Sequence, residues 1–186
     1  MHSQGLITRR VFSFVFKRGG VDGTVIFGEF SKDQIRGRVH YVPLVHSSPT
    51  VTSWIVQVES ITCEDGTSLV DNFSALLDTG SSRSYLPRIL VDRLFSGVWA
   101  ITSANGDIPC SAREEMPKLI VNLHRFHLSW LPKQYIVQLD TGLCQPGIQA
   151  IDPSVPVEAV LGLSFLRHSI TVFDADSLRV GFAGIV

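Results

Sequence analysis

Short runs rich in Val, Ile, Phe and Tyr recur along the chain and alternate with clusters of Gly, Pro, Asp and Ser. Runs of this kind, bounded by turn residues, are typical of β-strands. The residues from Trp54 to Ile61 alternate with period two, as a half-buried strand requires. Many short strands with little helix predict an all-β lobe, a sandwich or a barrel-like sheet. We predict strands at 11–16, 23–27, 36–43, 54–63, 73–77, 119–123, 135–139, 160–161, 169–173 and 180–183.

Two short helices are predicted within this β-rich chain. Pro87 suits the first turn of a helix, and a second helical turn is expected after Gly162. The apolar residues after Pro87 share one helical face, which consists of Leu90, Val91, Leu94 and Phe95. The chain has 186 residues, of which 45% are apolar and 18% charged, a length and composition that suit one folded domain. We therefore expect residues 1–186 to form a single domain.

Charge and hydropathy exclude several classes of partner. The net charge is −1, so the chain has no basic field that would hold nucleic acid or an anionic membrane. Its basic cluster, Arg9, Arg10, Lys17 and Arg18, is interpreted as solvated strand ends. No run approaches the roughly 18 apolar residues of a membrane span. The first twenty residues lack the apolar core of a secretion signal, so we expect no export signal in this chain.

The tripeptide Asp-Thr-Gly occurs twice, at 78–80 and at 140–142. A carboxylate at a strand end needs hydrogen-bond donors that orient it and favour its ionised form. A tight turn at Gly80 would let backbone N–H groups approach Asp78. The hydroxyl of Ser81 could donate back to the aspartate, and Thr79 could bond neighbouring backbone. The copy at Asp140 has no hydroxyl after its glycine, so we interpret it as a turn.

A second short element supports the choice of Asp78. The segment 159–162, Ala-Val-Leu-Gly, is an apolar strand that ends in glycine. Alone it is uninformative. Placed after the first element in the chain, it can supply the strand beneath which the Asp78 loop passes.

Other candidate residues are given structural roles. His124 and His127 are three positions apart, but no Cys or carboxylate set accompanies them, so we expect no metal site. No cofactor motif is found, and none is expected. Asp174 and Asp176 are interpreted as a turn. Ser81 and Ser82 lack the G-x-S-x-G context of a serine hydrolase.

Taken in order, the segments resemble the C-terminal lobe of the pepsin-like aspartic peptidases (peptidase A1). The resemblance covers nearly the whole chain. It implies a fold class that is all-β, one lobe of the bilobal acid protease fold with one or two short helices. Residues 1–20 would be the inter-lobe strand segment and 21–186 the lobe proper. The segments that carry the resemblance are 4–7 with 11–14, 23–28, 39–44, 54–61, 75–82, 160–162, 172–174 and 180–183.

The resemblance also implies roles for individual residues. Asp78 would be the second-lobe catalytic aspartate, and Thr79 would tie two such loops together. The positions that would line the cleft or orient the carboxylate are Gly80, Ser81, Ser82 and Gly162. Cys110 and Cys144 would form the disulfide of this lobe, which leaves Cys63 free and without an assigned role. The substrate would be a peptide or protein, and the family is largely secretory, vacuolar or lysosomal.

Catalysis in such enzymes uses two aspartates that share one proton, and this chain offers one. Three interpretations follow. The chain is one lobe of a two-lobed endopeptidase, or two copies pair as in the single-lobe retroviral-type proteases, or the lobe is a non-catalytic binding or decoy module. The strand at 11–16 would normally lie in the sheet between lobes, so we expect its edge to be exposed and the protein to self-associate.

Overall fold

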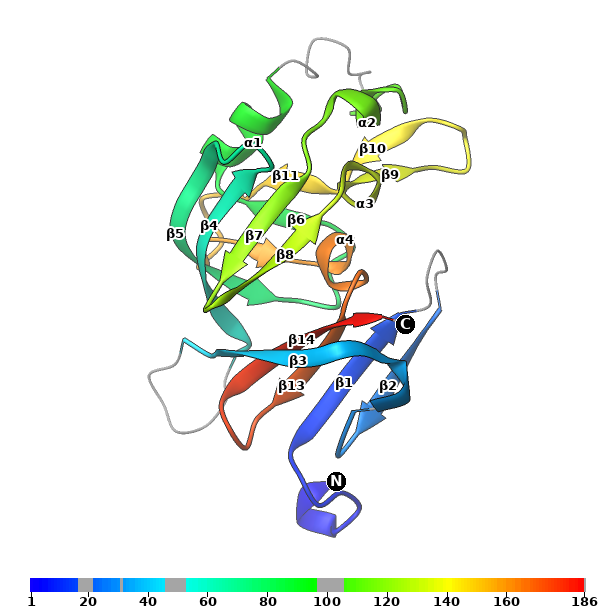
Figure 1. Cartoon of the computed structure of the whole chain (residues 1–186), viewed down its shortest axis with the longest axis vertical. Coiled ribbons are helices and arrows are strands. Elements are labelled where there is room, and N and C mark those ends of the chain that lie inside the picture. Colours follow the sequence, from blue (N-terminus) through cyan, green and yellow to red (C-terminus); the bar gives the residue numbers. More distant parts are fainter. Residues whose placement is uncertain (17–21, 31, 46–52, 97–105, 186) are drawn as a thin grey trace. The chain divides into compact units, whose positions relative to one another are not determined.

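A computed structural model describes residues 1–16, 22–30, 32–45, 53–96 and 106–185 (Figure 1). The chain divides into two compact units, Met1–Val56 with Leu166–Val186, and Gln57–Phe165. Strands predominate in both units, which confirms the all-β prediction. The described residues contain no helix long and apolar enough to cross a membrane.

The first unit is built on a five-stranded antiparallel sheet in the order β2-β1-β13-β14-β3. Its strands are β1 (Val11–Phe16), β2 (Gly23–Phe27), β3 (Ile35–Pro43), β13 (Ile170–Asp174) and β14 (Arg179–Ile185). Two 3₁₀ turns, η1 (His2–Gln4) and η2 (Lys32–Gln34), precede β1 and β3.

The position of β1 corrects one expectation. We expected the edge of this strand to be exposed, but it pairs with β2 on one side and with β13 on the other. Phe12 lies opposite both Phe27 and Phe173, and its ring stacks on that of Phe173 with centroids 4.8 Å apart. The partner strand β13 lies far from β1 in the sequence. Local sequence pattern predicts both strands but does not reveal that they pair, so the covered edge was not foreseen.

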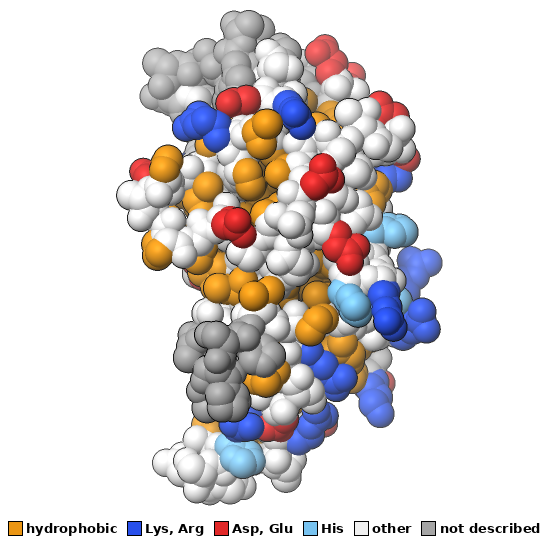
Figure 2. Space-filling view, turned by 90° about the vertical axis from the view of Figure 1, so that its left-hand side faces the viewer, with side chains coloured by type: hydrophobic (Ala, Val, Ile, Leu, Met, Phe, Trp, Pro, Cys, Tyr) orange, Lys and Arg blue, Asp and Glu red, His pale blue; other side chains and the backbone are white. Residues whose placement is uncertain are grey.

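The two faces of this sheet differ in character. One carries a small aliphatic core of Val11, Val15, Ile170, Val172 and Ala183. The opposite face carries an aromatic cluster that includes Phe12, Phe14, Trp54 and Phe173. Val25 and Phe27 of β2 lie on this second face and are 42% and 51% exposed. Apolar side chains also reach the surface in several places among charged ones on the face seen in Figure 2. Single exposed apolar residues of this kind are ordinary on protein surfaces.

Asp174 differs from its interpretation as a turn residue. It is the last residue of β13, its side chain is fully buried, and its carboxylate accepts hydrogen bonds from Arg9 (3.3 Å) and Arg179 (3.0 Å). A buried carboxylate needs such partners because desolvation penalises its charge. Asp176 does lie in the β13–β14 turn, where it accepts from the Arg10 side chain at 2.7 Å.

The second unit is built on a seven-stranded sheet in the order β11-β6-β12-β5-β4-β7-β8, with a separate two-stranded ribbon, β10-β9 (Figure 1). The β11–β6 and β12–β5 pairs are parallel. Its strands are β4 (Ile55–Cys63), β5 (Ser68–Leu77), β6 (Ser84–Leu86), β7 (Leu119–Leu123), β8 (Phe126–Trp130), β9 (Ile136–Gln138), β10 (Cys144–Pro146), β11 (Ile148–Ala150) and β12 (Val160–Leu161). Its helices are α1 (Arg88–Phe95), α2 (Ala112–Glu115), α3 (Pro132–Tyr135) and α4 (Leu163–Leu166).

The predicted helix after Pro87 is confirmed as α1, and its apolar face is buried. The predicted helical turn after Gly162 is confirmed as α4. Every predicted strand has a counterpart, although 135–139 is divided between the end of α3 and β9. Sequence pattern missed β6, β8, β10, β11 and the helices α2 and α3, most of which are only three or four residues long.

Candidate active site

Asp78 lies directly after β5, where that strand runs parallel to β12. The backbone N–H of Asp78 donates to the carbonyl of Leu161 at 3.1 Å, and Leu76 donates to Ala159 at 2.9 Å. β12 also pairs with β6 on its other side, so it lies between the strands that precede and follow the Asp78 loop. The expectation that 159–162 supplies the strand beneath this loop is therefore confirmed.

The Asp78 carboxylate is oriented by the turn that follows it. The N–H of Gly80 donates to Asp78 Oδ1 at 2.9 Å, and the N–H of Ser81 donates to the Asp78 carbonyl at 3.3 Å. Asp78 as a residue is half-buried, and Gly80 is exposed. The predicted approach of a backbone N–H to this aspartate is therefore observed, and Gly80 supplies it.

Two hydroxyl groups of the loop do not act as expected. Ser81 Oγ donates to the carbonyl of Arg83 at 2.9 Å, not to Asp78. A hydroxyl has one proton, so this bond uses the only proton that Ser81 could have given to the carboxylate. Thr79 is half-buried, and its hydroxyl forms no hydrogen bond with any described residue, so the predicted bond to neighbouring backbone is not formed. Ser82 is exposed and contributes its carbonyl, which accepts from Ser164 N–H at 3.2 Å.

Gly162 lies where the two segments of the site pass closest. A Cβ at this position would lie 2.1 Å from the Arg83 carbonyl oxygen and 2.7 Å from that of Ser81. Immediately after it, the N–H of Leu163 donates to the Ser81 carbonyl at 2.7 Å. Close contact with backbone atoms therefore requires glycine at this position. The absence of a side chain lets the start of α4 come close enough to form a hydrogen bond with the Asp78 loop.

A chain of buried hydroxyl groups supports the same place. Gly162 N–H donates to Ser84 Oγ at 3.1 Å, and Ser84 Oγ lies 2.9 Å from Ser164 Oγ. Ser164 Oγ in turn lies 2.8 Å from the carbonyl of Gly147, to which it donates. Because the Ser164 hydroxyl donates its one proton to the Gly147 carbonyl, Ser84 is the donor in the bond between the two hydroxyls. The chain is thus fully satisfied, as buried polar groups require.

Sequence reasoning missed Ser84 and Ser164. The sequence did offer one signal, since Ser164 stands between apolar residues in α4, and a buried hydroxyl needs a hydrogen-bond partner.

A second set of polar residues that sequence reasoning missed lies beside the Asp78 loop. Arg83 donates to Gln145 at 2.5 Å, and Gln145 donates to Asp107 at 2.6 Å. These bonds attach the end of the Asp78 loop to β10.

The second Asp-Thr-Gly is a turn, as predicted. It joins β9 to β10, and Gly142 has φ of 81°, a left-handed conformation that glycine adopts without strain. The Gly142 N–H donates to the Leu139 carbonyl at 3.0 Å. The predicted disulfide between Cys110 and Cys144 is formed, and Cys144 begins β10.

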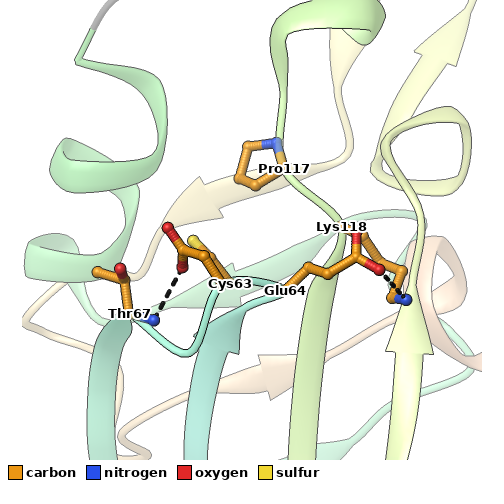
Figure 3. A pocket seen from close by; sticks show the side chains of 6 residues that line it. Cys63, Glu64, Thr67, Pro117 and Lys118 are labelled. Carbon is orange, nitrogen blue, oxygen red and sulfur yellow. Dashed lines mark hydrogen bonds and ion pairs between the residues drawn. The ribbon is translucent and has the colours of Figure 1, made fainter.

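Other candidate groups lie apart from this loop. His124 and His127 are exposed on the β7–β8 hairpin, and the described residues contain no group of three or more His, Cys, Asp or Glu placed to hold a metal ion. Cys63 is free and lines a shallow pocket with Glu64, Thr67, Pro117 and Lys118 (Figure 3). Burial, and to a smaller extent the nearby negative charge of Asp65, raises the pKa of the Cys63 thiol. A smaller fraction of this thiol is then ionised at neutral pH, and the thiolate is the nucleophilic form.

Comparison with known proteins agrees with this architecture. The family model described as "Eukaryotic aspartyl protease" matches residues 1–185. The chain is 29% identical over 200 residues to cathepsin E-B of Xenopus laevis, covering all of this chain and 48% of that protein. It is 32% identical over 190 residues to vacuolar protease A of Arthroderma otae, covering 98% and 46%, and 28% identical over 190 residues to pepsin A of Bos taurus, covering 98% and 49%. The chain spans about half the length of these curated relatives. A match over almost every residue shows that this chain belongs to the eukaryotic aspartyl protease family.

Proposed function

We propose that the chain contributes one half of the catalytic site of an aspartic endopeptidase, with Asp78 as its catalytic aspartate. The proposal rests on the oriented carboxylate of Asp78 at the end of β5, whose Oδ1 accepts a hydrogen bond from the Gly80 N–H at 2.9 Å. Membership of the aspartyl protease family supports the same chemistry. The substrate is a peptide or protein.

The reaction requires a second carboxyl group. In aspartic proteases two carboxyls share one proton and titrate as a pair. One accepts a proton from a water as the water attacks the peptide carbonyl, and the other donates a proton to the developing oxyanion. Asp78 forms no hydrogen bond with another carboxyl group among the described residues. In this proposal the second carboxyl comes from a first lobe or from another copy of the chain.

The remaining loop residues take supporting roles in this proposal. Gly80 fixes the orientation of the carboxylate through its N–H, and its exposed position leaves room for a peptide to approach. Gly162 keeps β12 in close contact below the loop. Ser82 is exposed, the hydroxyl of the half-buried Thr79 has no hydrogen-bond partner among the described residues, and Ser81 stiffens the turn through its bond to Arg83.

The test is cleavage of a fluorogenic peptide at acid pH, measured over a wide range of chain concentrations. Asp78→Asn is compared with Asp140→Asn, which makes the same change in the other Asp-Thr-Gly. We expect no turnover from molecules that light scattering shows to be monomeric. A rate that rises with the square of concentration, or that appears when a first lobe is supplied, should be lost in Asp78→Asn, kept in Asp140→Asn and inhibited by pepstatin.

Two results would overturn the proposal. Turnover by monomers, or turnover that persists in Asp78→Asn, would show that the chemistry does not depend on a shared pair that includes Asp78. A folded chain that stays inactive at every concentration and with an added first lobe would favour a binding module instead.

A further inference from the structure

The sequence of β5 contains the triplet Asn72-Phe73-Ser74, which has the N-x-Ser/Thr pattern of a glycan acceptor. Asn72 is exposed, whereas Phe73 is 4% exposed and belongs to the core. The backbone of Asn72 has φ of 53°, so the strand is kinked at this position. Asparagine is one of the few residues that adopts this conformation readily. The kink presents the side chain at the surface of a strand whose next residue is buried.

The hydrogen bonds of Asn72 leave its amide nitrogen available. Asn72 Oδ1 accepts from Gln57 Nε2 at 3.0 Å. Within the described parts of the chain, Nδ2 has no acceptor. N-glycosylation substitutes Nδ2 and leaves the amide oxygen in place. A sugar could therefore be attached without loss of the bond to Gln57.

The hydroxyl of the triplet has a partner that is synthesised much later. Ser74 Oγ donates to Glu158 Oε2 at 2.6 Å, and Glu158 lies 84 positions further along the chain. While residues 72–74 emerge during synthesis, this hydroxyl is not yet engaged. All three residues of the acceptor triplet are therefore available for glycosylation in the nascent chain before β12 pairs with β5.

The disulfide supplies an independent indication of compartment. Cys110 and Cys144 are bonded, and disulfides persist where proteins are secreted or processed in oxidising compartments. N-linked glycans are acquired along the same route. From these four observations we propose that Asn72 is an N-glycosylation site, a modification that is independent of the proposed proteolysis.

The chemistry is a glycosyl transfer from a lipid-diphosphate-linked oligosaccharide. Asn72 Nδ2 forms a bond to the anomeric carbon of the first sugar as the bond between that carbon and the diphosphate oxygen breaks. The lipid diphosphate leaves with the bonding electrons, and Nδ2 gives up one proton. The stretch from Asn72 in β5 to Asp78 directly after it spans up to about 20 Å, so the glycan is attached well away from the candidate catalytic loop.

The test is expression of the full chain in eukaryotic cells behind a cleavable secretion signal, followed by peptide mapping with mass spectrometry. We expect most secreted molecules to carry a glycan on the peptide containing Asn72, and peptide-N-glycosidase to remove it and leave aspartate at that position. Asn72→Asp, which keeps the backbone preference, should reduce occupancy to none. Ser74→Thr should keep the glycan, as should Asn122→Gln, whose asparagine is not in an acceptor triplet.

Mapping of the wild-type chain gives a result even if a variant fails to fold. Secreted wild-type protein with the Cys110–Cys144 bond formed and an unmodified Asn72 would overturn the proposal. So would an undiminished glycan in Asn72→Asp.

Discussion

Replacing Gly162 with alanine should destabilise the chain strongly, because a Cβ at this position meets rigid backbone. The new atom would lie 2.1 Å from the Arg83 carbonyl oxygen and 2.7 Å from that of Ser81. The φ of Gly162 is outside the left-handed region, so the cost is steric and does not come from backbone conformation. Overpacking of this kind costs about 1–3 kcal/mol and occasionally more.

Relief of that contact would also break hydrogen bonds. If the loop moves away, the 2.7 Å bond from Leu163 N–H to the Ser81 carbonyl and the 3.1 Å bond from Gly162 N–H to Ser84 Oγ are weakened. Each contributes about 0.5–1.5 kcal/mol. The total loss is then about 2–6 kcal/mol, a large part of the roughly 5–15 kcal/mol that stabilises a typical domain.

Urea unfolding followed by tryptophan fluorescence measures this loss. Trp130 Nε1 donates to the Ser164 carbonyl in α4 at 3.1 Å, so its emission reports on the segment next to Gly162. With an m-value near 2 kcal/mol/M, the midpoint should fall by about 1–3 M. Gly184→Ala is the matched control, because its Cβ would come no closer than 3.2 Å to another atom. Equal midpoints for the two variants would refute the argument that close backbone contact fixes glycine at 162.

Three further predictions concern the same unit. Hydrogen bonds from the Ser74 hydroxyl and, to a smaller extent, from the Ser74 N–H lower the pKa of Glu158. The stabilising effect of the Glu158 carboxylate is therefore present above the ordinary glutamate pKa and is lost as pH falls through the lowered value. Glu158→Gln should cost about 1 kcal/mol or less at neutral pH and nothing in strong acid, as measured by urea unfolding at both pH values. Opening the Cys110–Cys144 disulfide, which joins residues 34 positions apart, should cost about 3–4 kcal/mol, measured by calorimetry of oxidised protein against the Cys-to-Ser double variant. Ser164→Ala should cost about 1–3 kcal/mol because the buried Ser84 hydroxyl loses its acceptor, while the Gly147 carbonyl keeps its bond from the Ser84 N–H. Ser129→Ala, at an exposed site, should change the unfolding free energy by less than about 0.5 kcal/mol.

The strands β1 and β7, whose burial alternates over five or more residues, were predicted from local pattern. The missed strands β6, β10 and β11 are three residues long, which is too short for any periodicity to appear. Their strand conformation comes from pairing with distant segments, as in the parallel register of Ile148 with Ser84. The open edge expected for β1 was wrong for the same reason, because sequence pattern reveals a strand but not its partners.

The candidate site was predictable to the extent that it depends on neighbours in sequence. Gly80 lies two residues after Asp78, and its N–H reaches the carboxylate through a tight turn. The hydroxyl of Ser81 was assigned to the wrong acceptor, since the Arg83 carbonyl is also near in sequence and takes its proton. Which of two nearby acceptors wins is decided by the path of the loop, which in turn is set by the contact with Gly162.

The two copies of Asp-Thr-Gly show how far the tripeptide itself determines structure. At Asp140 the glycine adopts a left-handed φ of 81° and closes an ordinary turn between β9 and β10. At Asp78 the φ of Gly80 is outside that region, and its N–H holds the carboxylate instead. The difference comes from β12, which pairs with β5 and accepts the Asp78 N–H through the Leu161 carbonyl, and so fixes the end of β5. The conformation of the first copy therefore depends on a strand far along the sequence, and a variant that loosened β12 should turn the Asp78 loop into a turn like the other.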